Sequence, residues 1–200
     1  MDAGTQAEAG VGYPVGFSVE YPDRELNRLT TAFRPIVAIP IVIVAAAIGH
    51  SVSVLFLPPL LMIVFRQKYP RWWFDWNLEL QKFSSRICAY LALMDDRYPS
   101  TDERQVVTLD FPYPDARNGL NRWLPLVKWL LAIPHYVVLV FLWLATLVTV
   151  IVAWFAILFT GRYPRGLFNF VSGVFRWTNR VIAYAFLLVT DEYPPFRLSS

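Results

Sequence analysis

The sequence predicts a mostly α-helical integral membrane protein that consists of two tandem repeats. Hydrophobic residues make up 56 % of its 200 residues and charged residues only 16 %, whereas soluble domains average about 25 % charged residues. Two long runs, residues 36–65 and 129–161, contain no Asp, Glu, Lys or Arg, and short motifs recur at a spacing of 94 residues. For each repeat we expect a hydrophobic helical hairpin followed by an interfacial amphipathic helix, with short β segments in the linkers.

The recurring motifs divide the chain into two units of similar length. They are Leu-Asn-Arg at 26–28 and 120–122, Ala-Ile-Pro at 38–40 and 132–134, and Lys/Arg-Tyr-Pro-Arg at 68–71 and 162–165. Because so many matches share one spacing, they indicate an internal duplication. We therefore expect a flexible N-terminal tail at 1–12, a first repeat at 13–104 and a second repeat at 105–200.

Each repeat opens with a short segment in which apolar side chains occupy every second position. These residues are Val15, Phe17 and Val19 in the first repeat, and Val107, Leu109 and Phe111 in the second. Such alternation is typical of a half-buried strand. A Tyr-Pro pair closes each segment, and proline disfavours helix at the residue before it.

The two apolar runs are expected to enter the membrane as helical hairpins. About 20 helical residues cross the hydrocarbon core, so each run is too long for one upright span and short for two. Basic residues border both ends of each run: Arg24, Arg28, Arg34, Arg66, Lys68 and Arg71 around the first, and Arg122, Lys128, Arg162 and Arg165 around the second. Since Lys and Arg near a span collect in the cytoplasm, we expect a multi-pass protein of the cytoplasmic (inner) membrane, with these basic borders and both termini in the cytoplasm.

The two runs differ in where a hairpin could turn. The Gly-His-Ser sequence at 49–51 lies near the centre of the first run and can form a turn. The second run has no matching breaker, since residues 143–149 offer only two threonines. One long tilted helix per repeat is therefore the alternative, with Pro40 and Pro134 marking kinks or interfacial elbows.

Residues 75–94 and 168–189 are predicted to form the amphipathic helices. Their apolar stripes consist of Trp76, Leu80, Phe83, Ile87, Tyr90 and Met94, and of Phe170, Val174, Trp177, Val181, Tyr184 and Leu188. The opposite face is polar and basic, as in helices that lie in the headgroup plane; packing of the stripe on the protein's own hairpins is the alternative. Arg86, Arg176 and Arg180 on the polar faces are the candidate contacts for lipid headgroups, the alternative being that they snorkel.

The sequence contains no motif that carries catalysis or metal binding. HExxH, GxSxG, the P-loop and GxGxxG are absent. The single cysteine, Cys88, excludes a disulfide framework and a multi-cysteine metal site. His50 and His135 are too far apart in the sequence to argue for a metal site. We therefore expect no enzymatic activity and no cofactor, and we name no catalytic, cofactor-binding or metal-binding residue.

Four segments of the second repeat resemble a known family. Residues 120–123, 132–136, 154–166 and 184–188 are similar to the bacterial membrane proteins called domain of unknown function 4389. The resemblance extends over nearly the whole chain from Val15, and it implies a bacterial, mainly actinobacterial, cytoplasmic-membrane protein with no assigned activity. The first repeat departs from the pattern, because Ile41 stands where His135 would align.

These expectations lead to two hypotheses about function. The first is a non-enzymatic role as a scaffold, accessory subunit or bilayer-shaping protein, because a hydrophobic wedge beside an amphipathic helix displaces lipid mainly in one leaflet. The alternative is a channel or carrier for lipid or small apolar molecules, formed at the repeat interface or by oligomerisation. The expected partners are membrane lipids and a homo-oligomer or larger membrane complex. Nucleic acid is not expected, because the bases border apolar runs instead of forming a wettable basic surface.

Overall fold

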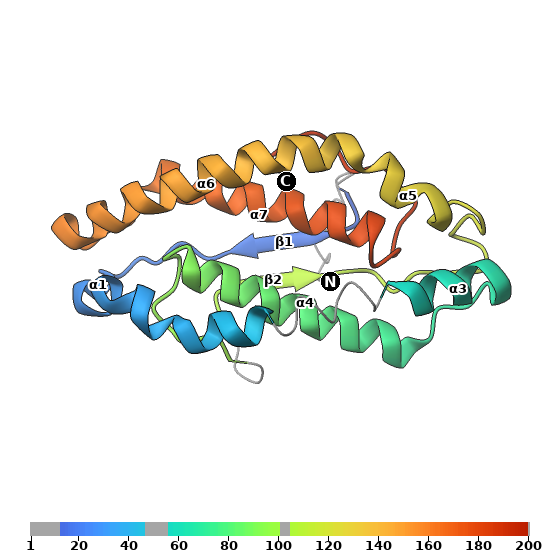
Figure 1. Ribbon diagram of the computed structural model, residues 1–200, viewed down its shortest axis with the longest axis horizontal. Coiled ribbons are helices and arrows are strands. Elements are labelled where there is room, and N and C mark those ends of the chain that lie inside the picture. The colour runs from blue at the N-terminus through green and yellow to red at the C-terminus, as the bar shows by residue number, and fades with distance from the viewer. Residues whose placement is uncertain (1–12, 47–55, 101–104, 200) are drawn as a thin grey trace, which may run out of the picture.

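The computed structural model describes residues 13–46, 56–100 and 105–199. These residues are mainly helical with one small sheet, so the predicted mostly α-helical class is confirmed. In chain order the elements are β1 (Gly16–Val19), α1 (Arg28–Val37), a helical segment Ile39–Ala46, α3 (Leu57–Arg66), α4 (Arg71–Leu91), β2 (Val107–Asp110), α5 (Pro125–Leu131), α6 (Ile133–Thr160) and α7 (Arg165–Ala185) (Figure 1).

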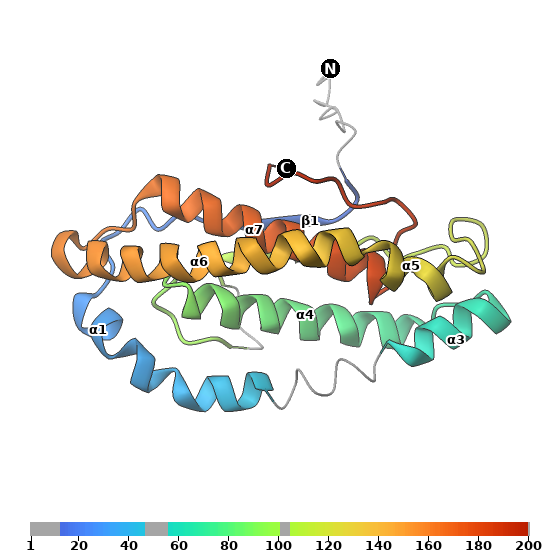
Figure 2. The ribbon, with the colours of Figure 1, turned by 45° about the horizontal axis from the view of Figure 1, so that its top comes forward.

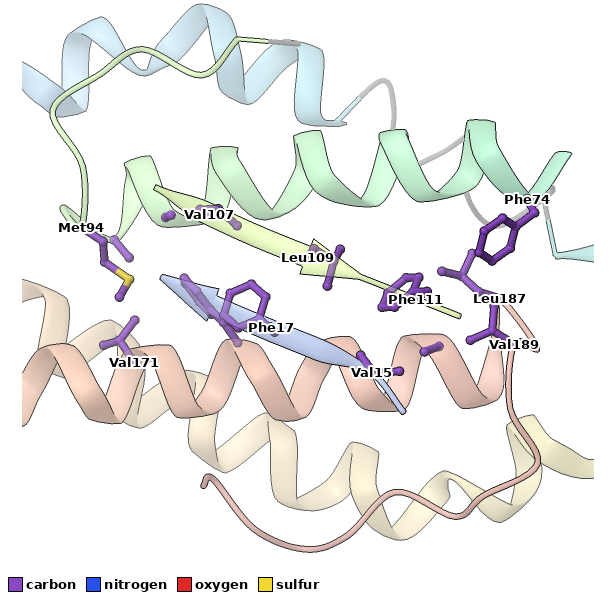
Figure 3. Packing of buried hydrophobic residues seen from close by; sticks show 14 of the residues in the cluster. Val15, Phe17, Phe74, Met94, Val107, Leu109, Phe111, Val171, Leu187 and Val189 are labelled. Atoms are coloured by element: carbon purple, nitrogen blue, oxygen red, sulfur yellow. The ribbon is translucent and has the colours of Figure 1, made fainter. Parts of the chain in front are cut away.

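The strands β1 and β2 pair antiparallel, with Phe17 opposite Leu109. The predicted alternation is present, because Phe17 and Leu109 are buried whereas Ser18 and Asp110 are exposed. α7 packs along β1 and α4 packs along β2. The two helices together therefore cover the apolar face of the sheet, where Phe17 and Leu109 lie within the main hydrophobic cluster (Figure 3).

The helices predicted at 75–94 and 168–189 are present as α4 and α7. Both begin earlier than predicted, directly after Pro70 and Pro164, whose extended backbone forms the N-cap. Proline fits this position because its backbone has no N–H to leave unpaired at a helix start. α7 lies against both α6 and β1 and is buried on most sides. Its apolar stripe therefore packs on the protein itself, as in the alternative interpretation of the stripe.

The second apolar run is not a hairpin. α6 continues without a break from Ile133 to Thr160, so the hairpin prediction for residues 129–161 is wrong and the long-helix alternative holds. The sequence between Pro134 and Gly161 contains no glycine or proline, so nothing interrupts the ladder of backbone hydrogen bonds. The helix ends at Gly161, whose φ of 73° is left-handed and therefore suits glycine.

Each apolar run has a break near its start, two residues before a proline. α1 and the segment Ile39–Ala46 meet at Ala38 with a bend of 46°, and α5 and α6 meet at Ala132. Pro40 and Pro134 lack the N–H that would bond to the carbonyl four residues earlier, so the helix is interrupted just before them. Pro40 therefore marks a bend and Pro134 marks a break between two helices, in line with the long-helix alternative.

The two described ends of the first apolar run lie far apart. Arg34, near its start, donates a hydrogen bond to the carbonyl of Tyr90 at the end of α4. Arg66 directly follows the last residue of the run and ends α3, and α4 begins soon afterwards at Arg71. Because α4 has 21 residues, these two places are about 30 Å apart, and α1 and α3 lie at opposite ends of the molecule (Figures 1 and 2). The described parts of residues 36–65 therefore do not form the two sides of a hairpin, and the turn predicted at 49–51 lies outside the described residues.

The elements stack in three layers. The sheet forms one outer layer, and α4 and α7 form the middle layer. α6 packs on α7 through Leu139 and Val181, and the segment Ile39–Ala46 packs on α4 through Ile41 and Ile87. The second outer layer, which we call the apolar layer, thus consists of α1, Ile39–Ala46, α3 and α6 (Figure 2).

Candidate functional site

The apolar layer exposes large hydrophobic side chains along its length. On α6 they are Val137, Val140, Phe141, Leu144, Leu147, Val148, Ile151, Val152, Phe155 and Phe159. On the other helices of the layer they include Leu29, Phe33, Ile36, Ile39, Ile43, Leu57, Leu61 and Phe65. Soluble proteins rarely expose contiguous apolar patches of this extent. The apolar layer is therefore the candidate surface for contact with lipid.

Helix α6 has the length and composition of a membrane helix. Within the described part of the chain it alone passes as a single span, while Arg28–Val37 and Ile39–Ala46 pass only together, as a bent pair. Only 17 % of its most apolar window is buried, whereas the core helix of a soluble protein is mostly buried. Its 28 residues measure about 42 Å, more than the roughly 30 Å of a hydrocarbon core.

The three arginines predicted to contact lipid headgroups all donate hydrogen bonds to backbone carbonyls. Arg86 Nη1 donates to Ser100 at 2.7 Å. Arg176 donates to Phe17 at 3.1 Å and to Leu198 at 2.9 Å. Arg180 is only 2 % exposed and donates to Arg197 at 3.3 Å. Arg176 and Arg180 thus fasten β1 and the C-terminal segment to α7, and lipid contact by the three arginines stays a prediction.

Arg34 forms a buried cation cluster at the C-terminal end of α4. Its side chain is 3 % exposed, and Nη1 donates to the carbonyls of Tyr90 at 3.0 Å and Asp95 at 2.8 Å. Nη2 forms an ion pair with Asp96 Oδ1 at 2.6 Å. The guanidinium also lies 4.5 Å from the centre of the Tyr90 ring, within the range of a cation–π contact.

Lys128 forms a second cluster of the same kind at the end of α7. The side chain is fully buried, and Nζ donates to the Thr190 carbonyl at 2.7 Å and pairs with Asp191 Oδ1 at 2.6 Å. Nζ lies 5.2 Å from the centre of the Tyr184 ring. Burial lowers the pKa of Lys128, and the hydrogen bond and charge of Asp191 oppose that shift.

Both clusters join the end of a long helix to the start of an apolar run. Their cations are neutralised by carboxylates and carbonyls, so the clusters hold structure together and provide no free acid or base. Sequence reasoning missed them, because it placed Arg34 and Lys128 in the basic borders that were expected to face the cytoplasm. The available signal was the spacing: the two cations are 94 residues apart, and Asp96 and Asp191 follow them at nearly equal distances.

An apolar cleft of about 360 Å³ opens between α1, the end of α4 and α6. Its walls are mainly hydrophobic: Pro35, Ala38, Leu91, Leu93, Val150, Ile151 and Trp154, with Arg34 at one side. Trp154 Nε1 donates to the carbonyl of Thr31 at 2.9 Å, which fixes the indole in the wall. A cleft with this lining suits a small apolar molecule or an acyl chain.

The remaining chemically reactive side chains are dispersed. His135 is fully buried, accepts a hydrogen bond from Trp177 Nε1 at 3.0 Å, and stacks on Phe196 with the ring centres 4.0 Å apart. Desolvation raises the pKa of the Cys88 thiol to about 11. His50 lies outside the described residues, among which no group of three or more His, Cys, Asp or Glu side chains could hold a metal ion.

One comparison identifies part of the chain. Residues 123–197 match the family model of a domain of unknown function, DUF4389. This match supports the family that the sequence resembles, over the second of the two predicted repeats. No curated protein and no solved structure matches the chain.

The DUF4389 region contains α5, α6 and α7 together with the cluster around Lys128. It also contains Arg176, Arg180 and the stacked pair of His135 and Phe196. The cluster around Arg34 and the apolar cleft's α1 wall lie outside it. The DUF4389 match thus includes α6, the candidate membrane helix, and the description of the matched family assigns no chemistry.

Proposed function

We propose that the protein is a non-enzymatic, bilayer-shaping scaffold of the cytoplasmic membrane, embedded in one leaflet through its apolar layer. The observation that carries the proposal is the contrast between the two outer layers. One exposes the hydrophobic side chains of α6 and the first apolar run, while the other exposes Ser18, Thr108 and Asp110 on the outer face of the sheet. A body with one apolar and one polar side inserts asymmetrically and displaces lipid on one side of the bilayer.

The layering favours helices that lie parallel to the membrane. α6 runs alongside α7 and α7 alongside β1, so an upright α6 would bring α4 and the sheet to the same depth in the bilayer. Exposed Asp75, Glu79 and Asp110 and the outer edges of the two strands would then lie in hydrocarbon. Charged groups and unpaired backbone groups are costly there. A flat orientation keeps them in water and replaces the multi-pass topology expected from the sequence.

The proposal includes the internal duplication, because several contacts come in pairs. Tyr21 donates to the carbonyl of Tyr163, and Tyr113 donates to the carbonyl of Tyr69. α4 and α7 both have 21 residues and start 94 residues apart. In the sheet, Phe17 pairs with Leu109, which is 92 positions later in the sequence. Tyr21 and Tyr113 are separated by the same number of positions. These pairs support two copies of one unit related by an approximate two-fold axis.

Cysteine labelling from each side of the membrane tests the flat orientation. Trp129→Cys and Arg162→Cys, each in a Cys88→Ser background, place thiols near the two ends of α6. We expect a membrane-impermeant maleimide to label both from the same side in spheroplasts and inside-out vesicles, together with Ser18→Cys on the sheet. Labelling of Trp129→Cys and Arg162→Cys from opposite sides would refute the flat orientation. Vesicles that keep their shape at saturating protein would refute bilayer shaping.

A carrier for small apolar molecules is the second candidate function, and the apolar cleft supports it. Ala38 lines the cleft and its side chain is buried, so Ala38→Trp would fill much of the space. We expect wild-type protein to bind a fluorescent fatty acid and Ala38→Trp to bind it at least tenfold more weakly. Equal binding by the two proteins would remove this candidate.

A further inference from the structure

A large open cavity lies where α3 ends and α4 begins. Its volume is about 780 Å³, and it is bounded on one side by residues 66–70 and on the other by the loop 113–117. Three of its side chains are cationic, those of Arg66, Lys68 and Arg117, and all three residues are exposed. Because residues 36–65 form the first apolar run, the cavity lies where that run meets water.

The positive charge of this cavity is only partly neutralised within the described residues. No carboxylate among them forms an ion pair with Arg66, Lys68 or Arg117. The cavity's acid, Asp115, accepts hydrogen bonds from the amide of Arg117 at 3.0 Å and from the side chain of Asn118 at 3.0 Å. Its carboxylate is thus held within its own turn, which lowers its pKa. Three positive charges therefore face one negative charge.

The walls of the cavity are held in place by buried contacts. Tyr69 is buried and its hydroxyl donates to the carbonyl of Leu187 at 2.9 Å. The hydroxyl of Tyr113 in turn donates to the carbonyl of Tyr69. The guanidinium of Arg71, which pairs with Asp75 at 3.4 Å, lies 4.7 Å from the centre of the Tyr113 ring and packs against that wall of the cavity. A site that is already ordered before binding loses less entropy when a ligand arrives.

The equivalent positions in the other half carry less positive charge. At the spacing of the repeated motifs, Thr160 stands in the place of Arg66 and Glu25 in the place of Arg117. Arg162, in the place of Lys68, is 3.9 Å from Glu25. Two of the three cations are thus absent at the equivalent positions, so they are not a constant part of the repeated motifs.

We propose that the cavity of Arg66, Lys68 and Arg117 binds a phosphate-bearing anion. Guanidinium and ammonium groups form short, charge-assisted hydrogen bonds with phosphate oxygens, and Met62 in the wall offers an apolar contact to the rest of the ligand. The phosphate belongs either to an anionic lipid headgroup or to a free phosphate compound. Binding of a lipid headgroup rests on the proposed membrane function, whereas binding of a free phosphate compound does not.

The test replaces two of the basic residues by the residues at the equivalent positions of the other half. The variant Arg66→Thr/Arg117→Glu is compared with Arg24→Thr/Arg97→Glu, which changes the formal charge equally but lies outside the cavity. The full chain is assayed with phosphatidylcholine vesicles with and without phosphatidylglycerol, and with pyrophosphate in neutral nanodiscs. We expect the cavity variant to lose about tenfold in affinity for at least one of the two anions, and the control variant to lose less than twofold.

Each outcome decides the proposal. A selective loss with phosphatidylglycerol assigns a lipid headgroup, and a selective loss with pyrophosphate assigns a free phosphate compound. Equal losses in both variants, or no loss in either, would overturn the site. Binding to pure phosphatidylcholine vesicles reports separately on the proposed membrane function, and circular dichroism melting verifies that both variants fold.

Discussion

At the scale of single residues, two of the buried cations are neutralised by carboxylates. Arg34 and Lys128 are buried, and each is neutralised by one aspartate and by backbone carbonyls. A buried ion pair adds little net stability compared with an apolar pair, but removal of one partner leaves an uncompensated charge. The clusters therefore specify which helix end packs against which apolar run. Their net contribution to the free energy of unfolding, compared with an apolar pair, is small.

Loss of the buried guanidinium should destabilise the protein strongly. Arg34→Met leaves Asp96 and two carbonyls without their donor, and we expect the free energy of unfolding to fall by about 3 kcal/mol. The control is Arg24→Met, which removes an exposed ion pair with Asp95 whose N···O distance is 3.7 Å. Exposed ion pairs are weak, so we expect the free energy of unfolding to fall by less than about 1 kcal/mol. Chemical unfolding in detergent measures both, and similar values would contradict the role assigned to Arg34.

The thiol of Cys88 should make stability fall at alkaline pH. Desolvation raises its pKa from 9.0 to about 11, so between these values the unfolded chain releases the thiol proton and the folded chain keeps it. The contribution is complete below pH 9 and is lost as the pH rises to 11. We expect Cys88→Ala to flatten this part of the pH–stability curve, measured by denaturant unfolding. Identical slopes for variant and wild type would contradict the assignment.

At the scale of elements, the periodicity of apolar residues predicted individual strands and helices. It could not predict how the helices are arranged relative to one another. The alternation around Phe17 and Leu109 predicted the strands, and the apolar stripes predicted α4 and α7. The hairpin predicted for residues 129–161 is wrong, because the rule that places basic residues in the cytoplasm holds for cations at the membrane surface and not for buried ones. Arg34 and Lys128 are in fact buried. A contact between residues 62 positions apart, such as Arg34 and Asp96, leaves no trace in local periodicity.

The helix ends offer a second test at this scale. α6 ends at Gly161 with a φ of 73°, whereas α3 ends at Gln67 with a φ of 48°. A left-handed backbone strains residues that have a Cβ atom. We expect Gln67→Gly to raise the free energy of unfolding by about 0.5–1 kcal/mol and Gly161→Ala to lower it by about 1 kcal/mol. Thermal unfolding checks both, and a destabilised Gln67→Gly would show that the glutamine side chain matters more than the backbone.

At the scale of the whole molecule, the layers create two sides of opposite polarity. The apolar layer faces one way, the polar face of the sheet faces the other, and α4 and α7 fill the space between them. In the proposed flat orientation, attachment to the membrane depends on a surface and not on a single residue. Sequence composition predicted contact with lipid. It could not predict the depth, because depth follows from the packing of α6 on α7 and of α7 on β1.

Lysines on the apolar layer should weaken attachment to vesicles. Leu144 and Val148 are exposed near the middle of α6, and Leu144→Lys/Val148→Lys would place two charges against hydrocarbon. We expect at least a tenfold weaker partition into phosphatidylcholine vesicles, measured by flotation. The matched variant Ser18→Lys/Thr108→Lys on the sheet should float like the wild type. A loss in the matched variant alone would indicate that the sheet, and not α6, meets the lipid.

The pairing of β1 with α7 has a consequence for synthesis. Residues 16–19 leave the ribosome long before residues 165–185, the helix against which β1 packs and whose Arg176 bonds to Phe17. The first strand must therefore wait for almost the entire chain to be translated before its apolar face is covered. Expression of residues 123–197 alone would leave Val171 and Phe175 without that cover, so a fragment cut at the family boundaries should aggregate unless the N-terminal segment is supplied in trans.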